Sequence, residues 1–237
     1  MAVTEACDGK GMMKRAALAM MSLGVLAAPA MADETGFYVG ANALSLLSTY
    51  RRSDIDSAFT SALAETDSSF KMGPSSVERA HYSWQVNFGY MLTRNFGVEV
   101  SFLDLGPFRY SGFGSRTSAV DGTPSEVHLD LDVRSHGPAL SAVGVLPMTN
   151  VWNLEARVGA MQAKTKSSFS TVTSDGTHSG DFSENSTVIL ASVGTAFTVT
   201  THIVLRVDYL RIQHIKEKAL DRTFNVDGAT AGVAYIF

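Results

Sequence analysis

The stretch from residue 82 to residue 103 decides the fold. Its first part, Tyr82-Ser83-Trp84-Gln85-Val86-Asn87-Phe88-Gly89-Tyr90, alternates aromatic or aliphatic residues with small or polar ones. After Thr93-Arg94-Asn95 the alternation resumes, with Phe96, Val98, Val100 and Phe102 on one face. A period of two is the repeat of a β-strand, and a short polar interruption between two such segments is typical of an antiparallel hairpin.

The same pattern recurs along the chain. Residues 140–146 and 152–161 flank Pro147-Met148-Thr149-Asn150, and residues 189–197 and 203–209 flank Thr200-Thr201-His202. Two further alternating segments, 37–43 and 229–237, bring the predicted number of strands to eight. The other connections are polar and are predicted to be long loops, at residues 49–80, 107–127, 167–186 and 216–225.

The composition of the two strand faces indicates which solvent each face meets. The polar face carries mainly Gly, Ser, Asn and Gln, and charged residues are 18% of the chain, against about 25% in ordinary soluble domains. A barrel with lipid outside and a hydrogen-bonded interior fits this pattern, because backbone groups in hydrocarbon must all be paired within the protein. We therefore predict an all-β, eight-stranded antiparallel transmembrane β-barrel of the outer-membrane type, with short periplasmic turns and long extracellular loops.

The first 32 residues have the character of an export signal. Met12-Met13-Lys14-Arg15 is basic, Ala16 to Pro29 is mostly apolar, and Ala30-Met31-Ala32 is a small-residue cleavage pattern. We expect residues 1–32 to be an upstream extension plus a cleaved signal peptide, with translation starting at Met1, Met12 or Met13, and residues 33–237 to be one barrel domain. This signal predicts export through the inner membrane to the outer membrane of a Gram-negative bacterium.

Charge and cysteine content exclude several classes of function. The net charge is −4, and because residues 1–32 carry +1, the remainder carries −5, which argues against a nucleic-acid partner. The single cysteine, Cys7, precedes the apolar segment, so neither a lipid anchor nor a disulfide is expected. No cofactor is expected.

Five charged residues fall on the predicted inner face: Glu99, Glu155, Arg157, Arg206 and Asp208. The interior of an eight-stranded barrel is just filled by side chains, so these five residues should pair with one another and plug the lumen. Two interpretations follow. The charges either lock the barrel structurally, which we favour, or form a gate whose rearrangement opens a narrow porin-like ion or solute path.

Several segments resemble the outer-membrane protein A transmembrane-barrel superfamily. They are Gly36-Phe37-Tyr38-Val39-Gly40-Ala41, the stretch from Trp84 to Tyr90 followed by Arg94-Asn95-Phe96-Gly97-Val98-Glu99, and Leu146-Pro147-Met148-Thr149. The resemblance covers residues 36–237. The chain stops at Phe237, so the peptidoglycan-binding domain that some members append is not expected.

The final strand resembles the C-terminal assembly signal of that superfamily. Thr230, Gly232, Tyr235 and Phe237 supply its polar residue, glycine, aromatic residue and terminal phenylalanine. The resemblance implies that periplasmic chaperones and the barrel assembly machinery recognise this strand during biogenesis.

The predicted loops are the candidates for recognition. Residues 49–80 are either a short helix, with Ile55, Ala58, Phe59, Ala62 and Leu63 at helical spacing, or a disordered loop. Host proteins or other surface ligands are possible partners there. The membrane itself supplies lipid and lipopolysaccharide, whose phosphates suit basic residues at the outer rim such as Arg109 and Arg116.

Two groups of residues have the composition of chemical sites. His81 and Ser83 form a His-x-Ser pair similar to that of lipid A deacylases, but alternation points Ser83 inward, so we disfavour a lipid A-modifying hydrolase and predict a protein that is not an enzyme. His128, Asp130, Asp132 and Arg134 share one strand face, but Arg134 competes for the carboxylates, so we predict no metal site.

A change of phase occurs in the same region. Leu129, Leu131 and Val133 are odd-numbered, whereas Leu140, Ala142 and Leu146 are even-numbered. This change predicts a β-bulge at Gly137-Pro138.

The leading functional hypothesis is a surface-structure and interaction protein, acting through its outer loops. The narrow pore is the alternative, and the hydrolase is third.

Overall fold

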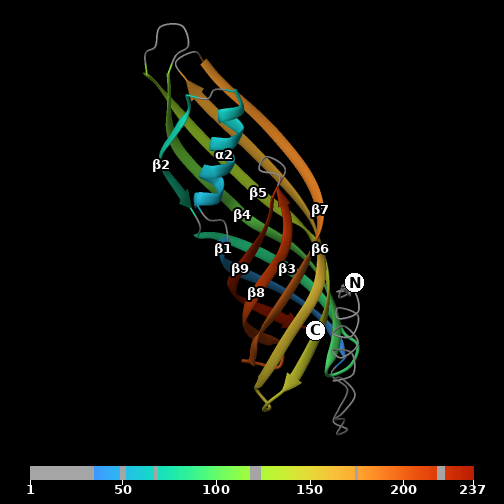
Figure 1. Cartoon of the computed structure of the whole chain (residues 1–237). Helices are drawn as coiled ribbons and strands as arrows, with labels where there is room; N and C mark the ends of the chain where they lie inside the picture. The colour runs from blue at the N-terminus through green and yellow to red at the C-terminus, as the bar shows by residue number, and fades with distance from the viewer. Residues whose placement is uncertain are drawn as a thin grey trace, which may run out of the picture. The chain divides into compact units, whose positions relative to one another are not determined.

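A computed structural model of the chain describes residues 35–48, 52–66, 69–78, 80–117, 124–173, 176–217 and 222–237 (Figure 1). The predicted upstream extension and signal peptide, residues 1–32, lie outside these residues. One helix and nine strands are described: β1 (Gly36–Ser48), α2 (Arg52–Thr66), β2 (Lys71–Glu78), β3 (Ala80–Met91), β4 (Phe96–Thr117), β5 (Pro124–Pro147), β6 (Trp152–Thr173), β7 (Gly176–Thr198), β8 (Ile203–Glu217) and β9 (Arg222–Ile236). Across these ranges, no helix combines the length and the apolar character that a membrane crossing requires.

Eight of the strands close into a ring. The antiparallel order β4-β3-β1-β9-β8-β7-β6-β5 returns to β4 through a β4–β5 pairing. The paired residues, followed once round the ring from Tyr38, return to β1 at Ser48, ten residues further along the strand. Such a stagger accompanies strong tilt of the strands, about 35–45° in closed barrels. The predicted eight-stranded antiparallel barrel is confirmed.

The three predicted hairpins are present, and their turns share one hydrogen-bonding pattern. Thr93, Thr149 and Thr200 each use Oγ1 to accept hydrogen bonds from the backbone N–H groups two and three residues ahead, at 3.0–3.3 Å. A threonine hydroxyl that binds nearby backbone in this way favours a tight turn. Both ends of the barrel chain lie at this same end, because Phe237 N donates to Phe37 O.

The opposite, outer end differs from the prediction. Most residues of the predicted loops 107–127, 167–186 and 216–225 lie in strands, since β4 runs to Thr117, β6 to Thr173 and β7 starts at Gly176. These Ser- and Thr-rich segments keep the alternation of a strand, with polar rather than apolar residues outside. The prediction of long loops there was therefore wrong in extent.

The long strands form a structure that we call the outer extension, made of β2 and residues 107–117, 124–136, 164–173 and 176–186. It continues beyond the ends of β1, β8 and β9 (Figure 1). β2 pairs with β4 alone, above the segment where β3 pairs with it. Of the two alternatives for residues 49–80, the helix is correct, because α2 spans Arg52–Thr66.

The helix α2 covers the inner face of the outer extension. Ile55 is completely buried against Phe108, Tyr110, Leu131 and Val133, with Phe59 stacked on Tyr110. Of the other residues that suggested the helix, the side chains of Ala62 and Leu63 lie outside the described ones. This water-exposed part of the molecule thus has an ordinary apolar core.

A polar contact fixes α2 to the strands. Tyr110 Oη and Ser75 Oγ each donate to Asp56 Oδ1 at 2.7 Å, and Arg52 Nε donates to Ser75 Oγ at 2.8 Å. Burial, together with the hydrogen bond to Asp56, raises the pKa of Tyr110, so the phenol stays protonated at ordinary pH.

The predicted bulge lies in a different strand. Inward and outward residues alternate without interruption from Val127 to Val143 of β5, and the register with β6 is constant across Gly137. The register shift is instead in β4, between Asp104 and Pro107, where Gly106 has a φ of 71°. The prediction at Gly137-Pro138 was wrong because the apolar residues change faces while the backbone of β5 does not.

Between the outer extension and the three short turns, the barrel presents its aromatic residues outward. Trp84, Phe88, Trp152 and Tyr209 are each 42–51% exposed, and none belongs to the buried clusters of the described residues. The inner face holds the small and polar residues. This is the distribution that a lipid-facing exterior requires.

Candidate functional site

Arg157 is the centre of the charged group inside the barrel. Its Nη1 lies 3.0 Å from Asp208 Oδ1, its Nε lies 3.4 Å from Glu99 Oε2, and its Nη2 donates to Glu155 Oε2. Every one of these side chains is no more than 7% exposed. One guanidinium thus contacts three buried carboxylates.

Arg206 is the second cation. Its Nε lies 3.4 Å from Glu155 Oε2, its Nη1 lies 3.8 Å from Glu99 Oε2, and its guanidinium carbon lies 4.6 Å from the centre of the Tyr38 ring. We call Glu99, Glu155, Arg157, Arg206 and Asp208 the lumen charge network. The structure brings together all five residues singled out from the sequence.

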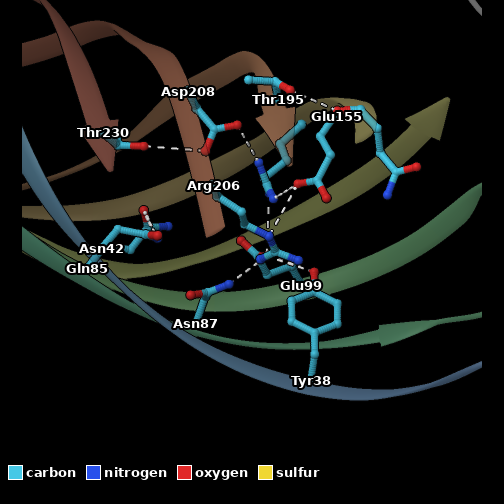
Figure 2. A network of polar contacts seen from close by, with 12 residues as sticks. Tyr38, Asn42, Gln85, Asn87, Glu99, Glu155, Thr195, Arg206, Asp208 and Thr230 are labelled. Atoms are coloured by element: carbon cyan, nitrogen blue, oxygen red, sulfur yellow. Dashed lines mark hydrogen bonds and ion pairs between the residues drawn. The ribbon is translucent and has the colours of Figure 1, made fainter. Parts of the chain in front are cut away.

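Neutral donors complete the network, in which three carboxylates face only two guanidinium groups. Tyr38 Oη and Asn87 Nδ2 donate to Glu99 Oε2 at 2.7 and 2.8 Å, and Thr230 Oγ1 donates to Asp208 Oδ2 at 3.4 Å (Figure 2). Because hydrogen bonds to a charged acceptor are stronger than neutral ones, these donors help to stabilise the excess negative charge.

The strand pattern explains why these residues meet. They come from β1, β3, β4, β6, β8 and β9, and each occupies an inward position between exposed neighbours. Tyr38 was not predicted in the network, although its place between Phe37 and Val39 gives it the inward parity. Gly89 makes room for its ring, because a Cβ there would lie 2.1 Å from Tyr38 Cζ.

Towards the outer end, the interior becomes apolar. A buried cluster from β1, β4, β5, β6, β7, β8 and β9 lies there: Leu44, Leu46, Leu103, Leu105, Ala139, Met161, Ala163, Val188, Leu190, Leu210, Ile212, Ile215 and Val226. We call this cluster the apolar layer. A cavity of about 20 Å³ is lined by both groups, including Glu99, Arg157, Leu190 and Leu210. Such a volume holds about one water molecule.

The four residues of the predicted assembly signal divide between the two faces of β9. Thr230 is buried inside, and Gly232 pairs with Asn42 of β1. Tyr235 and Phe237 are exposed outside, at 45% and 72%, with their rings in an edge contact at 5.2 Å. The two aromatic side chains are therefore accessible on the outer surface of the barrel.

His81 and Ser83 are not arranged as a catalytic pair. Ser83 is 8% exposed inside the barrel, and neither its Oγ nor His81 Nδ1 has a hydrogen-bond partner among the described residues. No hydrogen bond therefore links the histidine to the serine hydroxyl, which a general base would require.

The residues considered for metal binding form ion pairs on the outer surface. His128 Nε2 lies 3.0 Å from Asp130 Oδ2, while Asp132 accepts from Arg134 Nε at 3.1 Å and from Arg109 Nε at 3.3 Å. Within the described ranges, no three His, Cys, Asp or Glu residues gather in a way that would hold a metal ion.

Solved outer-membrane proteins have a similar arrangement of strands. The attachment invasion locus protein Ail of Yersinia pestis, solved with the heparin analogue sucrose octasulfate, is 16% identical with a TM-score of 0.47, covering 86% of this chain and 100% of its own. Neisserial surface protein A is 16% identical with a TM-score of 0.44, covering 85% and 97%. OprG of Pseudomonas aeruginosa is 12% identical with a TM-score of 0.44, covering 85% and 96%.

Comparison with curated proteins finds no match. The outer membrane protein beta-barrel domain family, however, matches residues 16–237, nearly the whole sequence. The closed ring of eight strands, with its aromatic residues outside and its charges inside, is an outer-membrane β-barrel of the kind that this family describes. The chain therefore belongs to the outer membrane protein β-barrel family and is a protein of the bacterial outer membrane.

Proposed function

We propose that this chain is a non-enzymatic outer-membrane protein with a closed lumen, which acts at the cell surface through its outer extension. The observation that carries the proposal is the succession of the lumen charge network and the apolar layer across the same interior. A polar solute would have to displace buried ion pairs and then pass the apolar layer, which fills the interior with large side chains.

The energetics favour a structural lock over a gate. Separating a buried ion pair costs about 3–5 kcal/mol, because it leaves an uncompensated charge. Arg157 makes three such contacts at once. Opening by rearrangement of the network would break several contacts and would still leave the apolar layer in place.

Electrical recording in planar bilayers tests the closed lumen. We expect neither the wild-type protein nor Arg206→Ala to produce stepwise currents, since the apolar layer remains in both. The lipid-facing Val207→Ala variant on the same strand is the control for insertion. Steady channels from the wild-type protein, or channels that appear only on loss of Arg206, would establish the narrow pore instead.

The surface role rests on the exterior of the outer extension. Phe113 and Val172 are 53% and 43% exposed there, outside the apolar core beneath α2. Large apolar side chains on a water-exposed surface are common at sites of protein contact. We assign any host or surface ligand to this exterior.

Adhesion of bacteria that display the protein tests this role. We expect the wild-type protein to increase adhesion above that of cells without it, and the Phe113→Ser, Val172→Ser double variant to abolish the increase. Ser168→Ala, on the same outward surface, is the control. No increase with the wild-type protein, or full adhesion by the double variant, would reject the surface role.

The non-enzymatic assignment rests on the lack of a hydrogen bond between His81 and Ser83 and on the inward position of the serine. We expect Ser83→Ala to leave the acylation pattern of lipid A in the producing cells unchanged. A change in that pattern, seen by mass spectrometry of extracted lipid A, would restore the hydrolase.

Biogenesis completes the proposal. We assign residues 1–32 to a removable upstream extension and signal peptide, so N-terminal sequencing of the protein from outer membranes should begin at Asp33. We assign Tyr235 and Phe237 to recognition by the assembly machinery, because both aromatic rings are exposed at the end of β9. Phe237→Ala should lower the inserted fraction and leave the stability of inserted protein nearly unchanged.

A further inference from the structure

A cluster of basic residues lies on the exterior of β5 and β6. We call it the basic patch: Arg134, His136, Lys164 and Lys166. The register places Arg134 directly opposite Lys166, and His136 opposite Lys164. The residues that alternate with them, such as Ser135, are buried inside the barrel, so the four side chains share the outer face.

The basic patch is poorly compensated within the protein. Asp132 is shared between Arg134 and Arg109, and Asp104, opposite His136, accepts a hydrogen bond from Gly106 N at 2.9 Å. In the part of the chain that the structure describes, Lys164 and Lys166 form no ion pair. Like charges directly opposite each other on a sheet are destabilising, so this arrangement favours an external anion.

The height of the basic patch above the apolar band points to the kind of anion. On β5 the exposed Leu140 is followed outward by Pro138, and then by His136 and Arg134. On β6 Val158 and Ala160 are followed by Gln162, and then by Lys164 and Lys166. Two residues of a strand tilted by about 45° rise roughly 5 Å, so the patch lies at the level of the lipid headgroups.

We propose that the basic patch binds phosphate groups of lipopolysaccharide in the outer leaflet. The inference rests on the membrane placement in the proposed function and adds a defined lipid site to it. Each cross-strand pair has Cβ atoms about 5 Å apart, which allows two basic side chains to contact one phosphate. The two pairs are separated by about 7 Å along the strands, so the patch offers two neighbouring phosphate positions.

The charge of the whole chain makes this local pattern informative. The protein is acidic, with a net charge of −4, so a group of cations on one section of its exterior does not follow from general basicity. On β8, the outward-facing Arg211 is paired with Asp227 of β9 at 3.7 Å. Among the described residues, by contrast, no ion pair compensates Lys164 or Lys166 of the β5–β6 section.

Calorimetric titration of the folded, full-length protein in detergent tests the site. The wild-type protein is compared with a double lysine variant, which carries both Lys164→Gln and Lys166→Gln. A matched double control carries both Lys71→Gln and Arg94→Gln and removes the same charge at exposed positions on β2 and in a short turn. The titrants are lipopolysaccharide, lipopolysaccharide stripped of its phosphates, and inorganic phosphate. A gel-shift assay confirms that each variant is folded.

We expect the wild-type protein and the matched control to bind lipopolysaccharide equally. The double lysine variant should bind roughly thirtyfold more weakly, at about one factor of five per lysine near an anionic surface. Stripped lipopolysaccharide should bind as weakly to the wild-type protein as native lipopolysaccharide binds to the double lysine variant. Inorganic phosphate should bind no more than marginally.

Three results would overturn the proposal: equal binding by both double variants, undiminished binding of stripped lipopolysaccharide, or tight binding of inorganic phosphate, which would indicate a free-anion site. These results are independent of the bilayer recordings. Channel currents would refute the closed lumen without affecting the basic patch, and loss of lipopolysaccharide specificity would leave the closed lumen intact.

Discussion

Replacing Arg157 with methionine should destabilise the barrel more than any exposed charge substitution. Arg157→Met keeps most of the side-chain volume but removes the cation that contacts Glu99, Glu155 and Asp208. Glu99 and Glu155 retain their contacts with Arg206, whereas the direct contact that Asp208 retains among the described residues is the Thr230 hydroxyl at 3.4 Å. Breaking a buried pair costs about 3–5 kcal/mol, so we expect a loss of free energy of unfolding in that range.

The same reasoning predicts a rescue by a second substitution. In the Arg157→Met background, Asp208→Asn removes the carboxylate that has lost its cation, so the double variant should regain roughly 1–3 kcal/mol, the cost of an unsatisfied buried group. In the wild-type background the same Asp208→Asn substitution should destabilise. A substitution that changes sign between backgrounds is the signature of a direct pair.

Urea titration in phospholipid vesicles, read from the gel mobility of folded and unfolded forms, gives these free energies. Arg109→Met is the control, because Arg109 is 59% exposed and its ion pairs with Asp132 and Glu78 lie at the surface, where such pairs contribute about 0–1 kcal/mol. If Arg157→Met also cost less than about 1 kcal/mol, or if Asp208→Asn added to its loss, the network would not stabilise the fold as described.

Three further predictions test other parts of the molecule. Val158→Arg on the lipid-facing surface should cost about 2–4 kcal/mol in the same urea assay, and Ser168→Arg, outward on the outer extension, close to nothing; equal costs would contradict the membrane placement. Gly89→Ala should displace the Tyr38 ring and cost about 1–3 kcal/mol by overpacking, so an unchanged stability would show that the ring has room to move. The pKa of Tyr110 is raised in the folded protein, so the stability that its protonated phenol contributes is complete below the pKa of the unfolded chain, about 10, and is lost as pH rises above that value. Proteolysis within α2 should therefore accelerate above about pH 10 in the wild-type protein and show no such alkaline step in Tyr110→Phe.

The hairpins could be predicted because lipid contact makes alternation unambiguous. In the two strands between Tyr82 and Phe102 the outward positions are large and apolar, and the inward ones, apart from Met91 beside the turn, are small, polar or charged. Such a contrast leaves no choice of face or register, since a slip of one residue would place Glu99 in lipid. The inward positions of the lumen charge network followed from the same parity, although its individual contacts did not.

The outer extension could not be recognised in the same way. Its strands are rich in serine and threonine, for example in residues 165–173 of β6, and their outward faces meet water. Polar residues on most outward positions, together with Ser and Thr at inward ones such as Thr165 and Ser167, resemble the composition of loops. What makes these segments strands is their long antiparallel pairing, such as Ser170 with Ser179, and the apolar cover provided by α2.

The apolar layer was missed for a related reason. Leucines such as Leu44, Leu103 and Leu210 fall at inward positions, but a face that already carried charges was interpreted as polar throughout. The interior changes character along the barrel axis, and a period of two carries no information about height. Only the register between strands shows that these leucines occupy one level.

The strands β4 and β5 move their apolar residues from the outer to the inner face by different means. Both must turn apolar residues outward where lipid surrounds the barrel and inward where water does. In β4 the apolar residues Val98 and Phe102 below the shift and Phe108 above it are all even-numbered, and the shift at Gly106 turns such positions from the outer to the inner face. In β5 the backbone is regular, and the apolar positions themselves change from even to odd.

Both changes occur at nearly the same level, since Asp104, just below the shift in β4, is paired with His136 of β5. Because the register shift in β4 and the change of apolar parity in β5 occur at one level, they indicate a change in the solvent around the barrel rather than a local irregularity. That level is where hydrocarbon gives way to water, and it lies directly beneath Arg134 and Lys166. The phase of the hydrophobic pattern thus marks the membrane boundary, and the unpaired cations stand where lipid phosphates would meet them.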